Sequence, residues 1–333
     1  NKAKGFCYQG QTHGHKGFLI KDLNLVKKLL KEEQNKNVLF PFLIGDCLVT
    51  AYNSQPDRYV IDFRKQDIFE AQKYKELYKI IEKEVLPEKQ EKANKEKLKN
   101  EKILKKNPNA KVNHDHESAL KTWWKLFRPR GELLDMFGTI SRYIVCSRVT
   151  TRPIFEFIST SIHPNDALQV FPLEDDYSFG ILSSRVHWVW FNARCSTLKG
   201  DPRYTSDTVF DSFPWPQKPT EKQIAAIAKY AVELRQKRKE IMEKNKFCLR
   251  DVYKTMETTP NNPVSEIQAE LDNAVGDAYG MSPEDDILEF ILKLNKKCHD
   301  REVAGKEITP PGLPKSVKDQ QKYISQDCVK MEE

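Results

Sequence analysis

The sequence predicts an α+β fold in which a β-rich module with an inserted Lys/Glu-rich helical arm is followed by a C-terminal helical region. Short β-branched and aromatic runs, bounded by turn residues, fill residues 142–182. Apolar residues recur at helical spacing from residue 220 onwards. Residues 88–113 consist mostly of Lys, Glu and Asn, which is typical of a solvated helical arm or a partly disordered insertion.

The part before the arm combines short strands with helices. Glycines punctuate apolar and aromatic residues in the first twenty positions, which indicates short strands and turns. A short helix is predicted over 22–33, and the composition of 58–63 is that of a buried strand. A stripe of apolar residues at helical spacing runs through 66–86, and Pro87 interrupts it.

The β-rich module continues after the arm, with four strand-like runs separated by turn chemistry at 142–149, 153–159, 167–173 and 177–182. An aromatic helix is predicted over 180–198. The run Phe213-Pro214-Trp215-Pro216 then favours an extended path, because a residue before proline avoids the helical region. We expect this run to be a stiff aromatic plug packed in a core.

The last third of the chain carries helix signals. Thr220 and Gln223 form a capping box before an apolar stripe. A second helix is predicted over 265–279, and a third from Ser282, which precedes a proline and acidic residues. Together these patterns predict three parts: a β-rich domain over 1–216 with the insertion at 88–113, a helical domain over 217–304, and a flexible tail over 305–333.

Composition restricts the class of protein. The chain has 333 residues and a net charge of +7, which suits a nucleic acid or an anionic surface as partner without requiring either. Its seven cysteines are scattered and lack a C-x-x-C pair, which favours a reducing cytoplasm over a disulfide scaffold or a zinc site. No run of apolar residues is long enough for a membrane helix, and we expect no signal peptide. Because the chain opens on Asn1, we expect it to be a piece of a longer protein.

Motifs for catalysis and metal binding are weak. Gly10–Gly17 matches neither phosphate-binding glycine pattern, although Thr12 and Lys16 suit contact with a polyanion. Histidine pairs two residues apart, without further ligands, do not predict a metal site. Asp57 and Asp62 suggest a metal-dependent nuclease, but the lysine that follows is misplaced for one. No serine or cysteine hydrolase motif is present.

Side chains suited to nucleic-acid contact are dense between residues 121 and 204. Arginine binds guanine edges and phosphates, and threonine reaches either. The candidate residues for DNA contact, including the two in the glycine-rich segment, are Thr12, Lys16, Trp123, Trp124, Arg128, Arg130, Arg142, Arg148, Thr150, Thr151, Arg152, Arg185, His187, Arg194, Lys199, Arg203 and Tyr204.

With these residues in place, the chain resembles the target-recognition and C-terminal region of MmeI-like adenine-specific DNA methyltransferases, which include type IIG restriction-modification enzymes and phage-defence methylases. The stretch from Gly180 to Pro216 carries the resemblance most specifically, through Ser183-Ser184-Arg185, His187, Arg203-Tyr204 and the proline-aromatic exit. Earlier and later landmarks follow in the expected order, within residues 5–297: Cys7–Ile20, Leu39–Leu48, Arg58–Phe63, Trp123–Arg130 and Leu271–Asn295.

The resemblance implies methyl transfer from S-adenosylmethionine to the N6 atom of an adenine flipped out of double-stranded DNA. That reaction needs a cofactor loop and an [ND]-P-P-[YF] motif, and the sequence contains neither: Asn261–Val264 and Thr309–Gly312 both lack essential positions. We therefore expect the catalytic core and the cofactor site in an N-terminal methyltransferase domain of the same bacterial, cytoplasmic protein. The chain itself is expected to bind no cofactor or metal and to be non-catalytic.

Two other functions stay open at this point. One is a metal-dependent DNA endonuclease domain built around Asp57 and Asp62. The other is a non-enzymatic subunit of a defence complex, in which tryptophans bind a partner protein.

Overall fold

The computed structural model describes residues 5–198 and 200–331. It divides into two compact units: unit 1 comprises residues 1–10, 43–56 and 133–333, and unit 2 comprises residues 11–42 and 57–132. Helices and small antiparallel sheets occur together, which confirms the predicted α+β class. Each unit is discontinuous in sequence, so the division differs from the consecutive domains that the sequence predicts.

Unit 1 contains a four-stranded antiparallel sheet of order β1-β8-β5-β6. Both faces of the sheet are buried, because alternate side chains of a strand enter different clusters. Ile144 packs in the cluster that contains α8 and α10, whereas Tyr143 and Val145 pack in the cluster that contains α2 and α7. Three of the predicted runs are confirmed, by β5 Arg142–Ser147, β6 Glu156–Ser159 and β8 Leu168–Phe171. The fourth strand of the sheet, β1, is Tyr8–Gln9.

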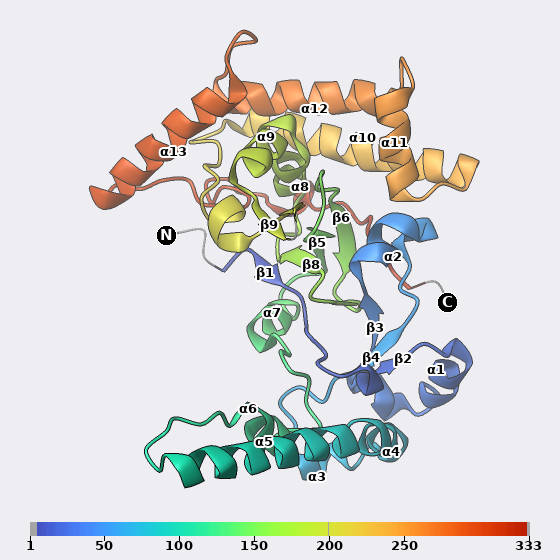
Figure 1. The fold of residues 1–333 in the computed structure, drawn as a ribbon. Coiled ribbons are helices and arrows are strands. Elements are labelled where there is room, and N and C mark those ends of the chain that lie inside the picture. The colour runs from blue at the N-terminus through green and yellow to red at the C-terminus, as the bar shows by residue number, and fades with distance from the viewer. Residues whose placement is uncertain (1–4, 199, 332–333) are drawn as a thin grey trace. The chain divides into compact units, whose positions relative to one another are not determined.

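Helices cover this sheet (Figure 1), and β9 and β10 form a separate two-stranded hairpin. The long α10 packs against α8 and α12, and α13 packs against α9. The helices of this part are α2 Gly45–Thr50, α7 Gly131–Met136, α8 Asp176–Ser183, α9 Arg185–Arg194, α10 Glu221–Asn245, α11 Leu249–Thr258, α12 Pro263–Tyr279 and α13 Ile287–Val303. The remaining strands are β7 His163–Pro164, β9 Ser196–Leu198 and β10 Asp201–Arg203.

Two predicted elements are corrected, one strand and one helix. The sequence predicts a strand over 177–182, but these residues lie in α8, where the side chain of Asp175 accepts a hydrogen bond from the backbone N–H of Ser178. The helix predicted from Ser282 begins instead at Ile287, because Asp286 caps it by accepting a hydrogen bond from the N–H of Glu289.

The C-terminal segment is packed, although the sequence predicts a flexible tail. Val317 and Tyr323 are buried. Val329 pairs with the edge strand β6. Its N–H donates a hydrogen bond to the carbonyl of Phe157, and its carbonyl accepts one from the N–H of Ser159. The segment thus continues the sheet of unit 1, a pairing that connects residues remote in sequence.

The aromatic plug is confirmed. Phe213 and Trp215 are 4% and 2% exposed and pack edge to face against each other. Tyr279 of α12 donates its hydroxyl hydrogen to the carbonyl of Pro214 at 2.8 Å. The plug therefore joins the β-rich part of unit 1 to its C-terminal helices.

Unit 2 surrounds a small antiparallel sheet of order β2-β4-β3 with helices. Phe18, Phe42 and Phe63 are fully buried in its core, and Trp123 is nearly so. Its elements are β2 Leu19–Ile20, α1 Leu23–Leu29, β3 Leu39–Leu43, β4 Tyr59–Ile61, α3 Ile68–Ala71, α4 Lys75–Glu84, α5 Leu86–Lys106 and α6 Asp115–Lys121.

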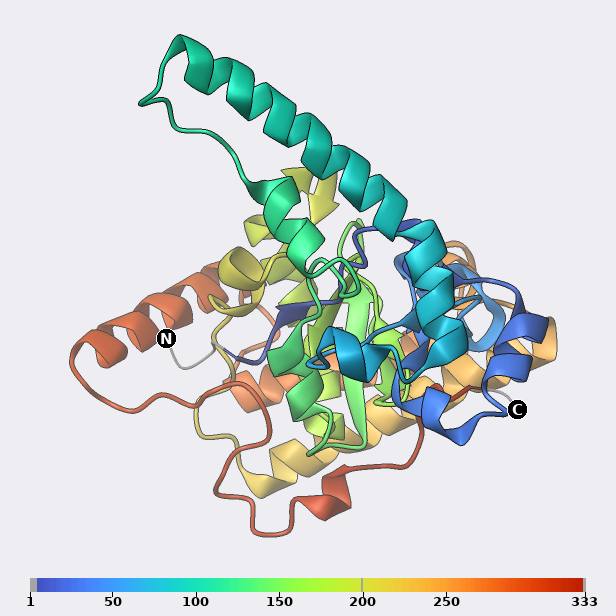
Figure 2. The same ribbon diagram turned by 90° about the horizontal axis from the view of Figure 1, so that it is seen from below.

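The Lys/Glu-rich arm is helical and folds back on itself, as the paired helices α5 and α6 show in Figure 2. Pro87 does not end the helical structure, because it lies in the first turn of α5, where proline is tolerated. Glu96 of α5 accepts hydrogen bonds from the N–H groups of His116 and Glu117, at 3.0 and 2.9 Å. These bonds give acceptors to two N–H groups in the first turn of α6, which have no partner within the helix, and they fix α6 against α5.

Candidate nucleic-acid interface

The loop after β5 and the hairpin formed by β9 and β10 lie side by side in unit 1. The N–H of Thr150 donates to the carbonyl of Pro202 at 3.0 Å, and the N–H of Tyr204 donates to the carbonyl of Arg148 at 2.7 Å. Val149 and Arg203 form the bridge between them. We call residues 148–153 the recognition loop; these backbone bonds hold it and the hairpin as one surface.

The recognition loop is stabilised from within. The hydroxyl of Thr150 donates to the carbonyl of Arg152 at 2.7 Å and accepts from its N–H at 3.2 Å. Thr151 is exposed at the tip. Arg148 uses its guanidinium to bind the carbonyl of Asp166 at 2.9 Å. The loop therefore has a defined shape although it contains no regular secondary structure.

Arg152 lies between two aromatic rings. Its guanidinium carbon is 4.8 Å from the ring centre of Trp188 on α9 and 5.0 Å from that of Tyr253 on α11. Glu257 lies 3.6 Å away and is largely exposed. Stacking of this kind orients a guanidinium before a partner arrives. Sequence reasoning found Arg152 but missed the two rings, because neither Trp188 nor Tyr253 is near it in the chain.

The helix α9 presents two further arginines at its ends. Ser184 caps the helix through its hydroxyl, which accepts from the N–H of His187 at 3.3 Å. Arg185 and Arg194 are exposed. The N–H of Arg185 donates to the carboxylate of Asp272 at 2.7 Å, and burial raises the pKa of that carboxyl group. Arg185 and Arg194 thus supply an exposed cation at each end of α9.

Arg142 is corrected from a DNA-contacting residue to a core residue. It is 1% exposed and donates to the carboxylate of Asp176 at 3.0 Å, to the carbonyl of Glu174 at 2.9 Å and to that of Asp327 at 2.7 Å. Arg235 of α10 binds the same two aspartates. This buried network connects β5, α8, α10 and the C-terminal segment.

His187 and Tyr204 are also corrected, because both side chains are fully buried. The imidazole Nε2 of His187 lies 3.0 Å from the hydroxyl of Tyr204. Burial lowers the pKa of His187 to about 3, so the ring is neutral near pH 7. Tyr204 stacks on Phe191, and His187 packs edge to face against Phe213. Both residues hold the hairpin against α9 and the aromatic plug and cannot reach a groove of DNA.

The candidates in unit 2 fall into two groups. Trp123 is buried, and Trp124 uses its indole N–H to bind the carbonyl of Gln66 at 3.2 Å, so both tryptophans belong to the core of this unit. The others lie at or near its surface: Lys16 and Arg128 are exposed, and Thr12 and Arg130 are half-buried. Thr12 and Arg128 are joined by backbone hydrogen bonds. Lys199 of the hairpin lies outside the described residues.

Neither metal chemistry nor the nuclease alternative gains support. No group of three or more potential metal ligands occurs among residues 5–198 and 200–331. Asp62 is 1% exposed and accepts hydrogen bonds from the side chain of Gln11 at 2.8 Å and the N–H of Arg64 at 2.9 Å. Burial raises the pKa of Asp62 although the hydrogen bond from Gln11 opposes this. Such a carboxylate is a structural group that supports the turn after β4.

Within the part of the chain that the structure describes, no helix has the length and apolar composition to cross a membrane.

One segment of the chain matches a known domain model, and the fold of the chain resembles a solved enzyme structure. Residues 147–217 match the model of the MmeI target recognition domain. No curated protein sequence matches the chain. Among solved structures, the type IIL restriction-modification enzyme MmeI, determined in complex with DNA, is similar with a TM-score of 0.66 and 20% sequence identity. The similarity covers 89% of this chain and 36% of that enzyme. The matched residues include the recognition loop, α9, the hairpin and the aromatic plug, so the chain contains an MmeI-like target recognition region.

Proposed function

We propose that this chain is the DNA sequence-recognition portion of an S-adenosylmethionine-dependent adenine-N6 DNA methyltransferase that acts in restriction-modification or phage defence. The observation that carries the proposal is the surface formed by the recognition loop and the β9–β10 hairpin inside the matched region. Backbone hydrogen bonds fix this surface, and the exposed or half-buried Thr151, Arg152 and Arg203 lie on it.

The chemistry of these side chains suits base readout. An arginine held in one orientation donates two parallel hydrogen bonds to a guanine, and threonine contacts either bases or phosphates. Each good bidentate contact is worth about 1–3 kcal/mol against a wrong base. Arg152 is oriented by Trp188 and Tyr253, and Arg203 is the last residue of β10, the strand that is bonded to the loop.

Methyl transfer is assigned in this proposal to an N-terminal methyltransferase domain of the same protein, which would bind S-adenosylmethionine and the flipped adenine. The 333 residues of the chain include neither the cofactor loop nor the [ND]-P-P-[YF] motif. The task of this chain is then to position the duplex so that the correct adenine enters the catalytic pocket. Such a protein would act in the bacterial cytoplasm, where its DNA substrate lies.

The test is binding of the purified chain to a pool of duplexes of random sequence, followed by sequencing of the bound fraction. We expect salt-sensitive binding and enrichment of a short sequence motif. Arg203→Ala should alter or erase the motif, while Lys222→Ala, on the exposed start of α10, should leave it unchanged. Absence of DNA binding even at low salt would refute the proposal.

A second measurement concerns catalysis. The chain alone should incorporate no methyl groups into DNA from labelled S-adenosylmethionine. Incorporation above that of a heat-denatured sample would contradict the assignment of methyl transfer to another domain.

A further inference from the structure

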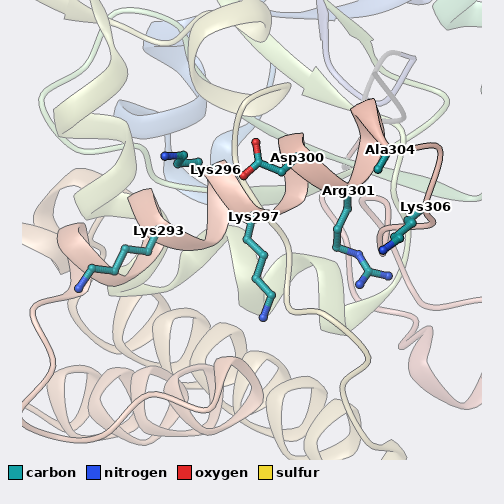
Figure 3. A pocket seen from close by; sticks show the side chains of 7 residues that line it. All are labelled: Lys293, Lys296, Lys297, Asp300, Arg301, Ala304 and Lys306. Atoms are coloured by element: carbon teal, nitrogen blue, oxygen red, sulfur yellow. The ribbon is translucent and has the colours of Figure 1, made fainter.

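Helix α13 carries a row of cations on one side. Lys293, Lys297 and Arg301 follow each other at intervals of four residues, and Lys306 reaches the same side from the loop after the helix (Figure 3). The three lysines are exposed. A shallow open hollow of about 380 Å³ is lined by these residues together with Lys296, Arg301, Ala304 and one carboxylate, that of Asp300. We call Lys293, Lys297, Arg301 and Lys306 the α13 row.

The loop that carries Lys306 has a defined path. Arg301 donates from its guanidinium to the carbonyl of Glu307 at 2.8 and 3.2 Å, and the N–H of Lys306 donates to the carbonyl of Arg301 at 2.8 Å. Gly305 provides the left-handed residue of the turn, with φ of +69°. The chain therefore folds back at the end of α13 and adds a fourth cation to the row.

Most of the α13 row lacks neutralising partners. Elsewhere, lysine-rich helices pair lysine with glutamate one turn away, as Lys92 does with Glu88 on α5. On α13, Lys293 pairs with Glu289, but Lys297, Arg301 and Lys306 form no ion pair with any described residue. The dipole of the helix stabilises cations only in its last turn, so it accounts for Arg301 and not for Lys293 or Lys297.

The opposite side of α13 is anchored to the matched region. Asn295 donates to the carbonyl of Ser212 at 2.6 Å, next to the aromatic plug. Ile291 and Cys298 are 1% and 5% exposed, and the helix packs against α9. The α13 row is therefore held in a fixed position relative to residues 147–217, on a face that points away from these contacts.

We infer that the α13 row binds the phosphate backbone of duplex DNA and acts as an anchor that carries no sequence information. The inference rests on the proposed function, because it takes duplex DNA as the partner. Lys293 and Arg301 are separated by eight residues, or roughly 12 Å along the helix. Duplex DNA carries about seven phosphate charges over that length. A row of cations at this spacing matches a linear polyanion better than a single small anion.

The test replaces the exposed lysines and keeps Arg301, which shapes the loop. In Lys293→Gln/Lys297→Gln/Lys306→Gln, affinity for a duplex of unbiased sequence should fall at least tenfold at about 0.1 M salt. A plot of log affinity against log salt between about 50 and 200 mM should be less steep by up to about 2.7, since each phosphate contact contributes about 0.9. Fluorescence anisotropy measures both, and thermal unfolding verifies that the variant is folded.

Two matched variants serve as controls. Lys222→Gln/Lys239→Gln/Lys244→Gln removes the same charge from exposed positions of α10 and should keep most of the affinity and the salt slope. Lys293→Arg/Lys297→Arg/Lys306→Arg keeps the charge and should bind like the parent.

The outcomes separate this inference from the proposed function. If the parent chain binds DNA and the α13 variant shows the same affinity and slope, the anchor is refuted and the recognition surface stands. An equal loss of DNA affinity in the α10 variant would also refute the anchor, because the change in net charge alone would explain the loss. If the parent chain does not bind DNA at all, the proposed function itself fails. A change in the selected sequence motif on loss of the α13 row would show base readout and contradict an anchor role.

Discussion

Replacement of Arg142 distinguishes a core residue from a DNA-contacting one. Arg142→Ala removes a guanidinium that is 1% exposed and stacks 3.6 Å above the ring centre of Phe157. It also deprives the buried carboxylate of Asp176 and the carbonyl of Glu174 of a donor. Loss of one partner from a buried ion pair costs about 3–5 kcal/mol. Because Arg235 still pairs with Asp176, we expect the free energy of unfolding to fall by about 3 kcal/mol, near the lower end of that range.

Unfolding in urea, followed by tryptophan fluorescence, measures this loss as a shift of the midpoint. The folded variant should bind duplex DNA with the affinity of the parent, whereas Arg203→Ala should reduce binding and leave the midpoint in place. Arg142→Lys keeps the charge but not the five donors, so its loss of stability should be intermediate. A loss below about 1 kcal/mol for Arg142→Ala, combined with weakened DNA binding, would refute the assignment of Arg142 to the core.

Two further variants test the aromatic and helical packing of unit 1. In the folded state His187 is neutral, with a pKa of about 3. In the unfolded chain a histidine has a pKa of about 6.5. As pH falls, the unfolded state therefore binds a proton first, which lowers the free energy of unfolding. Between pH 7 and 5.5 the free energy of unfolding should decrease by about 1 kcal/mol more in the parent than in His187→Gln, and equal decreases in urea titrations would contradict this. In Gly180→Ala, the added Cβ would lie 2.5 Å from the Cγ2 of Ile227 on α10. We expect the free energy of unfolding, measured in urea, to fall by about 1–3 kcal/mol. An unchanged midpoint would show that α8 and α10 pack less tightly than this distance implies.

Local patterns predicted the elements whose signals lie within a few residues. The strands β5, β6 and β8 follow β-branched and aromatic runs bounded by turn residues. The capping box of Thr220 and Gln223 is present at the start of α10. The burial of Phe213 and Trp215 follows from their size and from the stiffness that proline gives the chain.

The predictions from the sequence were wrong where burial or a partner far along the chain determines the local structure. Helix α8 is buried on all sides, so its apolar residues show no helical period and resemble a strand. Arg142 has the chemistry of a DNA-contacting residue, but its partner Asp327 lies far along the chain, in a segment whose composition predicts a flexible tail. Helix α13 begins later than its predicted cap Ser282, because Asp286, which the sequence places in the first turn, is the residue that caps it.

The burial of one residue in the hairpin segment determines the exposure of its neighbour. Tyr204 is fully buried beneath the hairpin and lies 3.0 Å from His187 through its hydroxyl. Because successive residues of an extended chain point to opposite sides, burial of Tyr204 turns Arg203 toward the surface shared with the recognition loop. Under the proposed function, Tyr204 and His187 act on recognition through position rather than contact. That function therefore predicts that substitution at Arg203 changes specificity at little cost in stability, whereas substitution at Tyr204 disturbs the orientation of the side chains on the hairpin.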